Sequence, residues 1–379
     1  MRRHTLATLA GVAALGVLSA LPAQAENAPA GEVSAIVSLD GWRNAQGGAR
    51  RGSILVAAAQ LTLQVDAERA FGWRGASFAL AGLYSDKAVA SDLVGDIHTV
   101  DNRDAPAGAN LYEAWVRQAF AGGYAKAGVI DLNTEFAVNN TGALFINGAQ
   151  GLGLEMAQLG WRGPSTYPRP RAAAVASLAK GGVWKLGVFS GARADPDAVG
   201  RRPRGTPTLA VLEFAGGLGA HGRLTLGAWR HSANYGSSLA APARRAGLGG
   251  YGLLEQSLWR GGGRRLDGFL RLGRADPKAQ AIASDLAAGL VLANPFVGRE
   301  GEAAGLAVLR STAGARFRRL EPAAPRHETV VEATYRLPLG HGLALQPDAQ
   351  YVIRPGGAPG QRDAVVFGVR LDGAWSRAF

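Results

Sequence analysis

Apolar and polar residues alternate along much of the chain with the two-residue period of a β-strand. Residues 54–66 keep this alternation throughout, with Leu55, Leu61 and Leu63 on one face and Gln60 and Thr62 on the other. A segment of that length is long for a strand in a soluble sheet, where about 5–6 residues are common, but it suits a tilted membrane strand. The pattern therefore predicts an all-β fold built from long strands.

The same pattern predicts about 14 to 18 strands along the chain, joined antiparallel by alternating short and long connections. The clearest segments are 32–42, 54–66, 76–84, 111–120, 124–132, 172–178, 183–190, 208–214, 223–231, 252–259, 266–273, 286–292, 304–311, 329–337, 343–353 and 364–371. Many connections are glycine pairs or triples, which suit tight turns. Residues 85–110 and 137–170 lack the alternation. We interpret the first as a long loop at, or folded into, a barrel mouth, and the second as a region with a short helix or a constriction loop.

The densest stretch, residues 111–136, reads as two strands around Gly122-Gly123. Alternation puts one set of side chains on each face. The first strand places Leu111, Glu113, Trp115 and Arg117 on one face, and Tyr112, Ala114, Val116 and Phe120 on the other. A soluble sheet turns its apolar face inward, whereas a membrane barrel turns it toward lipid and its polar face toward a wet lumen. The hairpin alone leaves both possibilities open.

The first 25 residues have the features of a cleavable secretory signal peptide. Arg2 and Arg3 precede an apolar run over residues 6–21, and Ala23-Gln24-Ala25 is a small-x-small cleavage site. We expect a mature chain of residues 26–379 that forms one domain, with a net charge of +10 after two arginines are removed from the +12 of the whole chain. No later stretch reaches the roughly 20 apolar residues of a membrane-spanning helix. The mature chain is thus predicted to be exported, either as a soluble protein or as an outer-membrane barrel.

Composition and aromatic placement favour the barrel. Cysteine is absent and glycine is abundant at 54 residues, which favours turns and bent strands over long helices. Aromatic residues gather near predicted strand ends, as the girdles of membrane barrels require, at Trp42, Trp73, Tyr84, Phe120, Tyr124, Trp229 and Trp259. The chain ends in Phe379, and a terminal aromatic residue suits a last strand that carries an assembly signal.

Several motifs resemble the carbohydrate-selective porin family of the OprB type. They are LYEAWVRQAF with GVIDLNTEF and ALFINGAQG after it, LVGD at 93–96 upstream, and LQPDAQYVIRPGG at 345–357. Between them, YGLLEQSLW, FLRLGRADP and GLVLANPFVGRE have the order and spacing of the family. The resemblance extends over nearly all of the mature chain.

This resemblance implies a transmembrane antiparallel β-barrel of about 16 strands, with long extracellular loops and short periplasmic turns, in the outer membrane of a Gram-negative bacterium. The function that it implies is passive, carbohydrate-selective diffusion of small sugars, monosaccharides such as glucose, through a polar lumen. A general porin without sugar preference shares every barrel feature and stays open. Which sugar is preferred, and whether the barrel works alone or as a trimer, also stay open.

A sugar pore needs polar groups that exchange hydrogen bonds with hydroxyls and bind weakly enough for release. Alternation predicts that charged and polar side chains of several strands line the lumen and contact sugar. The candidates are Glu113, Trp115, Arg117, Asp131, Asp267, Arg271, Glu332, Arg336, Asp348, Gln350 and Arg370, with Gln346, Arg354 and Asp372 on the same faces. The predicted partners are sugars, outer-membrane lipid and lipopolysaccharide (through loop residues Arg201, Arg202, Arg204, Arg244 and Arg245), and the barrel assembly machinery through the strand that ends at Phe379.

Other functions find little support in the sequence. The six histidines form no HExxH or other metal-ligand spacing, and neither a GxSxG elbow nor a phosphate-binding loop is present. We therefore expect no enzyme activity, cofactor or metal, with a lipase-like barrel enzyme as a distant alternative. A soluble periplasmic sugar-binding protein is disfavoured by the long strands. Nucleic acid is not an expected partner, because the basic residues are dispersed and the chain is exported.

Overall fold

The computed structural model describes residues 29–159, 163–191, 208–232, 247–296, 301–320, 322–356 and 360–379. These residues form sixteen antiparallel strands, each hydrogen-bonded to its neighbours in sequence, and the first strand pairs with the last to close a barrel. The strands are β1 Gly31–Gln46, β2 Gly52–Asp66, β3 Ala76–Ser85, β4 Gly108–Phe120, β5 Gly123–Ile130, β6 Arg171–Ala179, β7 Val183–Ser190, β8 Thr208–Leu218, β9 Gly222–His231, β10 Gly247–Gly261, β11 Arg264–Ala275, β12 Ile282–Ala293, β13 Ala303–Ala313, β14 His327–Gly340, β15 Leu343–Ile353 and β16 Ala364–Ala378. The predicted all-β barrel is confirmed, and β7 and β15 have the predicted bounds.

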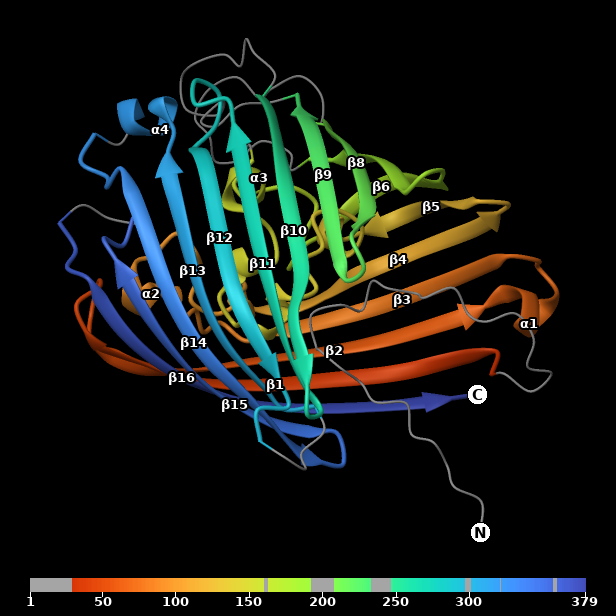
Figure 1. Cartoon of the computed structure of the whole chain (residues 1–379), viewed down its shortest axis with the longest axis horizontal. Helices are drawn as coiled ribbons and strands as arrows, with labels where there is room; N and C mark the ends of the chain where they lie inside the picture. The colour runs from red at the N-terminus through yellow and green to blue at the C-terminus, as the bar shows by residue number, and fades with distance from the viewer. Residues whose placement is uncertain are drawn as a thin grey trace.

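Short and long connections alternate over much of the barrel. Two residues join β4 to β5, β10 to β11 and β14 to β15, whereas residues 86–107 join β3 to β4 and residues 131–170 join β5 to β6. The tight turns lie at the end where β1 begins and β16 finishes, which is the periplasmic end in membrane barrels. Figure 1 shows the C-terminus and α1 (Ala67–Phe71) on one side, and α2 (Ser91–Val94) and α4 (Ala315–Leu320) on the other.

The outer surface is apolar because alternate residues of each strand point away from the lumen. Exposed outward side chains include Leu39, Leu55, Leu61 and Leu80, each at least 40% exposed. No helix among the described residues is long and apolar enough to cross a bilayer.

Aromatic side chains ring the periplasmic end of the barrel. Phe71, Trp73, Phe120, Trp259 and Phe379 are all largely exposed there. The girdle assignment was wrong for three residues, since Trp42 and Trp229 are buried inside the barrel and Tyr124 donates a hydrogen bond to the interior Glu135. Trp42 turns inward because its Nε1 donates to the buried carboxylate of Asp101, 2.7 Å away.

A β-bulge in β4 changes the faces predicted for that strand. Ala81 pairs with Glu113 and Gly82 with Leu111, so Tyr112 is an extra residue on β4. Glu113 and Trp115 face the interior as predicted, whereas Leu111 is exposed and Tyr112 is buried, the reverse of the prediction. Strict alternation fails here because the bulge adds one residue to β4 with no added residue on β3, so the residues before the bulge change face.

The interior is filled in large part by two connections. The β3–β4 loop (residues 86–107) contains α2, and the β5–β6 loop (residues 131–170) contains three 3₁₀ turns, η1 Leu132–Thr134, η2 Gly142–Leu144 and η3 Gly148–Gln150, and the short helix α3 Leu154–Ala157. In Figure 1 the yellow coils of the β5–β6 loop lie within the ring of strands. Phe145 and Phe136 of this loop pack against wall residues such as Phe269 and Phe189. The first connection lies inside the barrel, one of the two places that the sequence left open for it, and the second contains a short helix, α3.

Candidate functional site

The β5–β6 loop is held to the barrel wall by carboxylates that accept its backbone amides. Glu332 of β14 accepts hydrogen bonds from the amides of Ile146 and Asn147, at 2.6 and 3.1 Å. Farther round the wall, Glu213 accepts from the amide of Ala137 at 2.7 Å, and Glu255 accepts from the amide of Thr141 at 2.8 Å. The short turns of this loop leave backbone amides without partners inside a helix. A carboxylate that points inward from the wall accepts a strong, charge-assisted hydrogen bond from such an amide.

A buried chain of polar groups joins both loops to the wall. His98 of the β3–β4 loop lies between Glu328 of β14, 2.5 Å from its Nδ1, and Ser311 of β13, 2.9 Å from its Nε2. Ser311 donates to Asp285, and Asp285 pairs with Arg271 of β11. Arg271 in turn donates to the carbonyl oxygens of Ala149 and Gln150 in the β5–β6 loop.

The charges around His98 favour its protonated form. Burial on its own would lower the pKa of His98, but the hydrogen bond to Glu328 and the charges of Glu328, Asp285 and Asp96 outweigh burial and raise it. An imidazolium donates from both ring nitrogens, which fits acceptors at Glu328 and Ser311.

A second buried group fixes the β3–β4 loop beside the barrel seam. Arg370 of β16 pairs with Asp40 of β1 and also donates to Asp101 and Asn102 of the loop, at 2.8 and 2.9 Å. Gln350 of β15 joins the two loops, because its Nε2 donates to the carbonyl oxygen of Val100 and its Oε1 accepts from Asn147.

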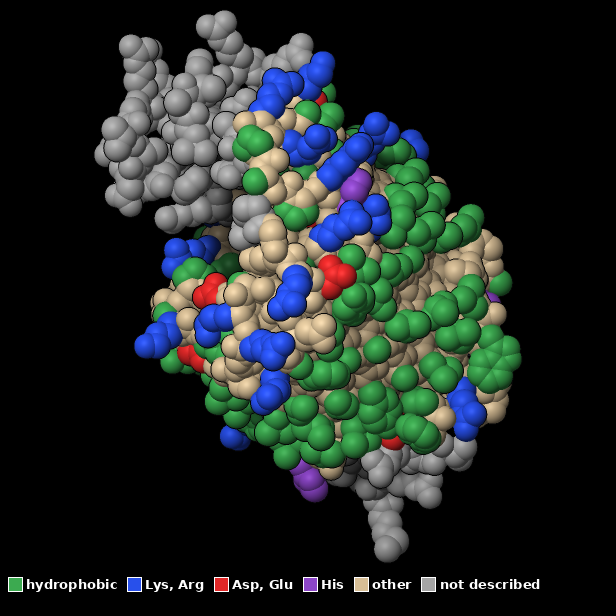
Figure 2. Space-filling view, turned by 90° about the vertical axis from the view of Figure 1, so that its left-hand side faces the viewer, with side chains coloured by type: hydrophobic (Ala, Val, Ile, Leu, Met, Phe, Trp, Pro, Cys, Tyr) green, Lys and Arg blue, Asp and Glu red, His purple; other side chains and the backbone are tan. Residues whose placement is uncertain are grey.

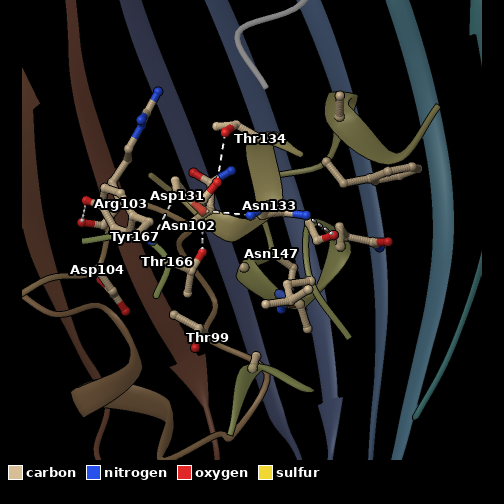
Figure 3. A pocket seen from close by; sticks show the side chains of 18 of the residues that line it. Thr99, Asn102, Arg103, Asp104, Asp131, Asn133, Thr134, Asn147, Thr166 and Tyr167 are labelled. Carbon is tan, nitrogen blue, oxygen red and sulfur yellow. Dashed lines mark hydrogen bonds between the residues drawn. The ribbon is translucent and has the colours of Figure 1, made fainter. Parts of the chain in front are cut away.

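The two loops and strands β1 to β4 enclose a polar cavity of about 360 Å³. This volume falls in the range of about 300–1,000 Å³ that is common for small-molecule sites. Its polar lining, much of it shown in Figure 3, comes mainly from the loops. It includes Gln60, Asn102, Arg103, Asp104, Glu113, Asp131, Asn133, Thr134, Asn139, Asn147, Thr166 and Tyr167.

Asp131 organises one side of the cavity. Its carboxylate accepts from the hydroxyls of Tyr112 and Thr166 and from the amides of Asn133 and Tyr167. Figure 3 shows Asp131 beside Asn133, Thr166 and Tyr167. Burial raises the pKa of Asp131, and these hydrogen bonds offset part of that rise. Its own amide donates to Glu113 at 2.9 Å, so the structure brings together two residues that the sequence placed on one face.

Arg103 supplies a cation to the same cavity. The hydroxyl of Tyr167 donates to the backbone carbonyl of Arg103, and Figure 3 shows the guanidinium extending away from the Asp131 group. Among the described residues, Arg103 has no salt-bridge partner, and its buried Nε has no hydrogen-bond acceptor. The Tyr112 and Tyr167 rings meet edge to face at 6.1 Å and give this side an aromatic surface.

The predicted lumen residues fall into three groups. Glu113 and Asp131 line the cavity. Arg271, Glu332, Asp348, Gln350 and Arg370 face inward but are buried, and all of them except Asp348, which accepts from Gln350, hold the inward loops directly. Trp115, Arg117, Asp267 and Arg336 have local partners: Lys126 lies 4.1 Å from the Trp115 ring, Arg117 lies 4.3 Å from the Tyr124 ring, Asp267 pairs with Arg265, and Arg336 pairs with Asp372.

Three further positions complete the comparison with the sequence. Gln346 and Asp372 face the interior and are buried. Arg354 is exposed beyond the end of β15 with φ of 56°, so its prediction as a lumen residue was wrong. The left-handed backbone there breaks the alternation that placed it inside.

Most of the cavity lining escaped the sequence analysis. Asn102, Arg103, Thr166 and Tyr167 lie in loops, where no periodicity marks a face. The available signal was the concentration of Asn and Asp in two connections too long for turns. Among the described residues, no group of three His, Cys, Asp or Glu side chains is placed to hold a metal ion.

Comparisons with known proteins agree with the barrel. The family described as "Carbohydrate-selective porin, OprB family" matches residues 56–374. The high-pH structure of Pseudomonas putida OprB is 17% identical with a TM-score of 0.72, over 91% of this chain and 94% of that one. The DcaP channel of Acinetobacter baumannii is 9% identical with a TM-score of 0.57, over 93% and 99% of the two chains. The trimer form of Vibrio cholerae OmpT is 9% identical with a TM-score of 0.54, over 92% and 100%. A search of curated proteins found no match.

Proposed function

Because the chain belongs to the OprB family of carbohydrate-selective porins, we propose that the cavity between its two inward loops is the selective part of the sugar path. The protein is a sugar-selective channel of the bacterial outer membrane. The proposal concerns which residues meet the sugar. The observation that carries it is a polar cavity in which one cation, Arg103, lacks an ion pair among the described residues.

The lining suits a neutral solute with many hydroxyl groups. Arg103 and Asn102 offer donors, whereas Glu113 and Asp131 offer acceptors, so a sugar exchanges water contacts for equivalent protein contacts. The Tyr112–Tyr167 pair presents ring edges and faces to the apolar CH groups of a sugar. Most carboxylates are already engaged by loop amides, which keeps binding weak enough for release. The cavity volume favours monosaccharides such as glucose.

The family favours a channel over the alternative of a lipase-like enzyme, and we propose no catalytic role. The lipid around the outward leucines and the assembly machinery at the Phe379 strand stay proposed partners. The amide of Phe379 donates to Gly31, so this last residue seals the β1–β16 seam. Both a monomeric and a trimeric barrel fit this function. The predicted signal peptide and the loop arginines proposed to contact lipopolysaccharide, at 201, 202, 204, 244 and 245, lie outside the described residues.

Single-channel conductance with stepwise glucose tests the proposal. We expect saturable block by glucose. In Arg103→Ala the block should be weaker, because the binding free energy of glucose loses roughly 1.5–3 kcal/mol, the contribution of a hydrogen bond to a charged group. Arg264→Ala, which removes an exposed arginine beside the tight turn between β10 and β11, is the matched control and should keep the block. Conductance that glucose never blocks would leave a general porin. Equal block in wild type and Arg103→Ala would move the sugar contacts elsewhere in the lumen.

A further inference from the structure

Four arginines and a histidine gather at the outer rim of the barrel, where β13, β14 and β15 end. We call Arg310, Arg318, Arg326, His327 and Arg354 the rim patch. All four arginines are exposed, and the charge of each acts on His327 through space. Arg310 lies on β13, His327 on β14 and Arg318 on α4, whereas Arg326 and Arg354 lie in the connections just before β14 and just after β15.

Strand register fixes where the rim patch lies relative to the lipid-facing surface. Arg310 of β13 pairs with Thr329 of β14, and Thr312 pairs with His327, so Arg310 and His327 share the outward face at successive rows. One row closer to the membrane centre, Val308 pairs with Val331.

Val331 of β14 also pairs with Tyr351 of the next strand, β15, so the apolar row continues across three strands. Val331 and Tyr351 are 36% and 43% exposed. The outer face therefore changes from apolar to cationic within one residue pair along the strands. Figure 2 shows Lys and Arg side chains gathered on this side of the molecule along the edge of a broad hydrophobic surface.

The rim patch has little local compensation for its charge. Among the described residues, none of its arginines forms a salt bridge. Arg310 donates to the neutral hydroxyl of Thr329 at 3.4 Å, and Nδ1 of His327 lies 3.2 Å from the hydroxyl of Thr312.

Among the described residues, two neighbouring carboxylates already have partners inside the chain. Asp363 accepts from the hydroxyl of Tyr351 and the amide of Arg354, at 3.0 and 2.9 Å. Glu328 points into the barrel, where it accepts from His98. Within the described part of the chain, the guanidinium groups are thus available to an anion from outside.

We propose that the rim patch binds the phosphate groups of a phosphorylated lipid in the outer leaflet, with its acyl chains against the row of Val308, Val331 and Tyr351. Guanidinium groups bind phosphate oxygens in a bidentate manner, and several close arginines suit a head group with more than one phosphate. The apolar row directly below selects a lipid over a free anion, because only a lipid joins a phosphate to hydrocarbon at that depth. Lipopolysaccharide has this chemistry. The site requires the outer-membrane location but does not depend on how sugar passes through the lumen.

A lipid-binding measurement on the full-length folded barrel tests the site. The barrel is titrated in nanodiscs with fluorescent lipid A that carries both phosphates, and in parallel with the same lipid after phosphate removal. The test variant combines Arg310→Gln, Arg326→Gln and Arg354→Asn. Asparagine is chosen at 354 because it tolerates the left-handed backbone there. We expect the variant to lose at least about tenfold in affinity for the bisphosphorylated lipid, since each arginine near a membrane surface contributes separately.

The control removes the same charge from the opposite rim, with Arg74→Gln, Arg264→Gln and Arg377→Gln. It should bind like wild type, and the lipid without phosphate should bind both triple variants and wild type equally. Millimolar inorganic phosphate should not displace the lipid. Equal affinity in wild type and the rim variant, or displacement by inorganic phosphate at the concentration of bound lipid, would overturn the proposal. Heat-modifiable migration verifies that each variant is folded, and unchanged glucose block in the rim variant separates this site from the sugar path.

Discussion

Arg370 of β16 and Asp40 of β1 face each other across the strand pair that closes the barrel, and they form a bidentate ion pair. The Nε and Nη2 atoms of Arg370 lie 2.7 Å from the two carboxylate oxygens of Asp40. The same guanidinium reaches Asp101 of the β3–β4 loop. One cation therefore compensates two buried acids and ties the seam of the barrel to a loop in its lumen.

Replacing Arg370 with alanine should strongly destabilise the barrel. Both carboxylates would be left buried without their cation, and breaking a buried pair in this way costs about 3–5 kcal/mol. The free energy of unfolding in urea, measured by the loss of heat-modifiable migration, gives the size of the effect. Arg265→Ala is the matched control, because Arg265 is half exposed and, in the described part of the chain, its one ion pair is with Asp267. Its loss should fall within the about 0–1 kcal/mol of a surface pair, and equal losses in the two variants would contradict a special role for the seam.

Glu332→Ala should release one side of the β5–β6 loop. The change leaves the amides of Ile146 and Asn147 without their acceptor, at a cost of about 1–3 kcal/mol for each unsatisfied group. We expect a larger and noisier single-channel conductance, because the loop occupies the lumen. Asp267→Ala is the control, since this inward residue pairs with Arg265 near the periplasmic end. A Glu332→Ala channel with wild-type conductance and noise would show that the remaining anchors fix the loop alone.

Stability should fall as pH rises toward 8, in part because of Glu155 in α3. Burial and the nearby charge of Asp285 raise the pKa of Glu155 to about 8, although Arg271 opposes them. The folded protein thus keeps a proton that the unfolded chain releases near its ordinary value of about 4.3, so stability declines across that window and levels off above it. His98 acts with the same sign, because a histidine with a raised pKa loses its stabilising effect as pH rises through that value.

Glu155→Gln should flatten this pH dependence. The variant should approach wild-type stability near pH 5 and exceed it at pH 8. The gain in unfolding free energy at pH 8 is up to about 1.4 kcal/mol for each unit by which the pKa of Glu155 in the folded protein exceeds that in the unfolded chain. Urea unfolding at steps from pH 5 to pH 9 measures both curves. Glu32→Gln, at an exposed position near the periplasmic end, should run parallel to wild type. Parallel curves for Glu155→Gln and wild type would show that Glu155 is ionised in the folded barrel.

The sequence predicted the barrel wall well because membrane strands obey one simple rule. Each strand must be apolar outside and polar inside, so residues such as Leu55 and Leu61 reveal both the strand and its face. The interior was harder to predict. Arg271 and Glu332 were correctly expected to face inward, but alternation carries no information about which inward side chains contact a loop and which contact water.

Two kinds of local chemistry were invisible to the pattern. Trp42 satisfies its indole N–H on Asp101, a residue 59 positions away, so its position near a strand end was a misleading sign of a girdle. Gly273 lies against the buried carboxylate of Glu155, and a Cβ at this position would come within 2.1 Å of it. Glycine there makes room for α3, which only the folded chain shows.

The bulge at Tyr112 leads to the last prediction. It turns the Tyr112 hydroxyl toward Asp131, and it does so at the centre of the proposed sugar path. Tyr112→Phe keeps the ring that packs on Tyr167 and removes only this donor to a buried carboxylate. We expect a loss of about 1.5–3 kcal/mol in unfolding free energy, the range for hydrogen bonds to charged groups. Glucose block should also weaken, because Asp131 would be less firmly oriented toward the cavity.

Tyr84→Phe provides the matched control for that change. Tyr84 points outward from β3 and is 51% exposed, so removal of its hydroxyl should alter stability by no more than about 0.5 kcal/mol and leave the glucose block unchanged. Urea unfolding and single-channel block by glucose are measured on both variants. If Tyr112→Phe lowers stability but not the block, Asp131 is a structural residue, and the sugar contacts shift to Arg103 and its neighbours. If it lowers neither, the remaining donors, Thr166 and the amides of Asn133 and Tyr167, are sufficient to hold Asp131 in place.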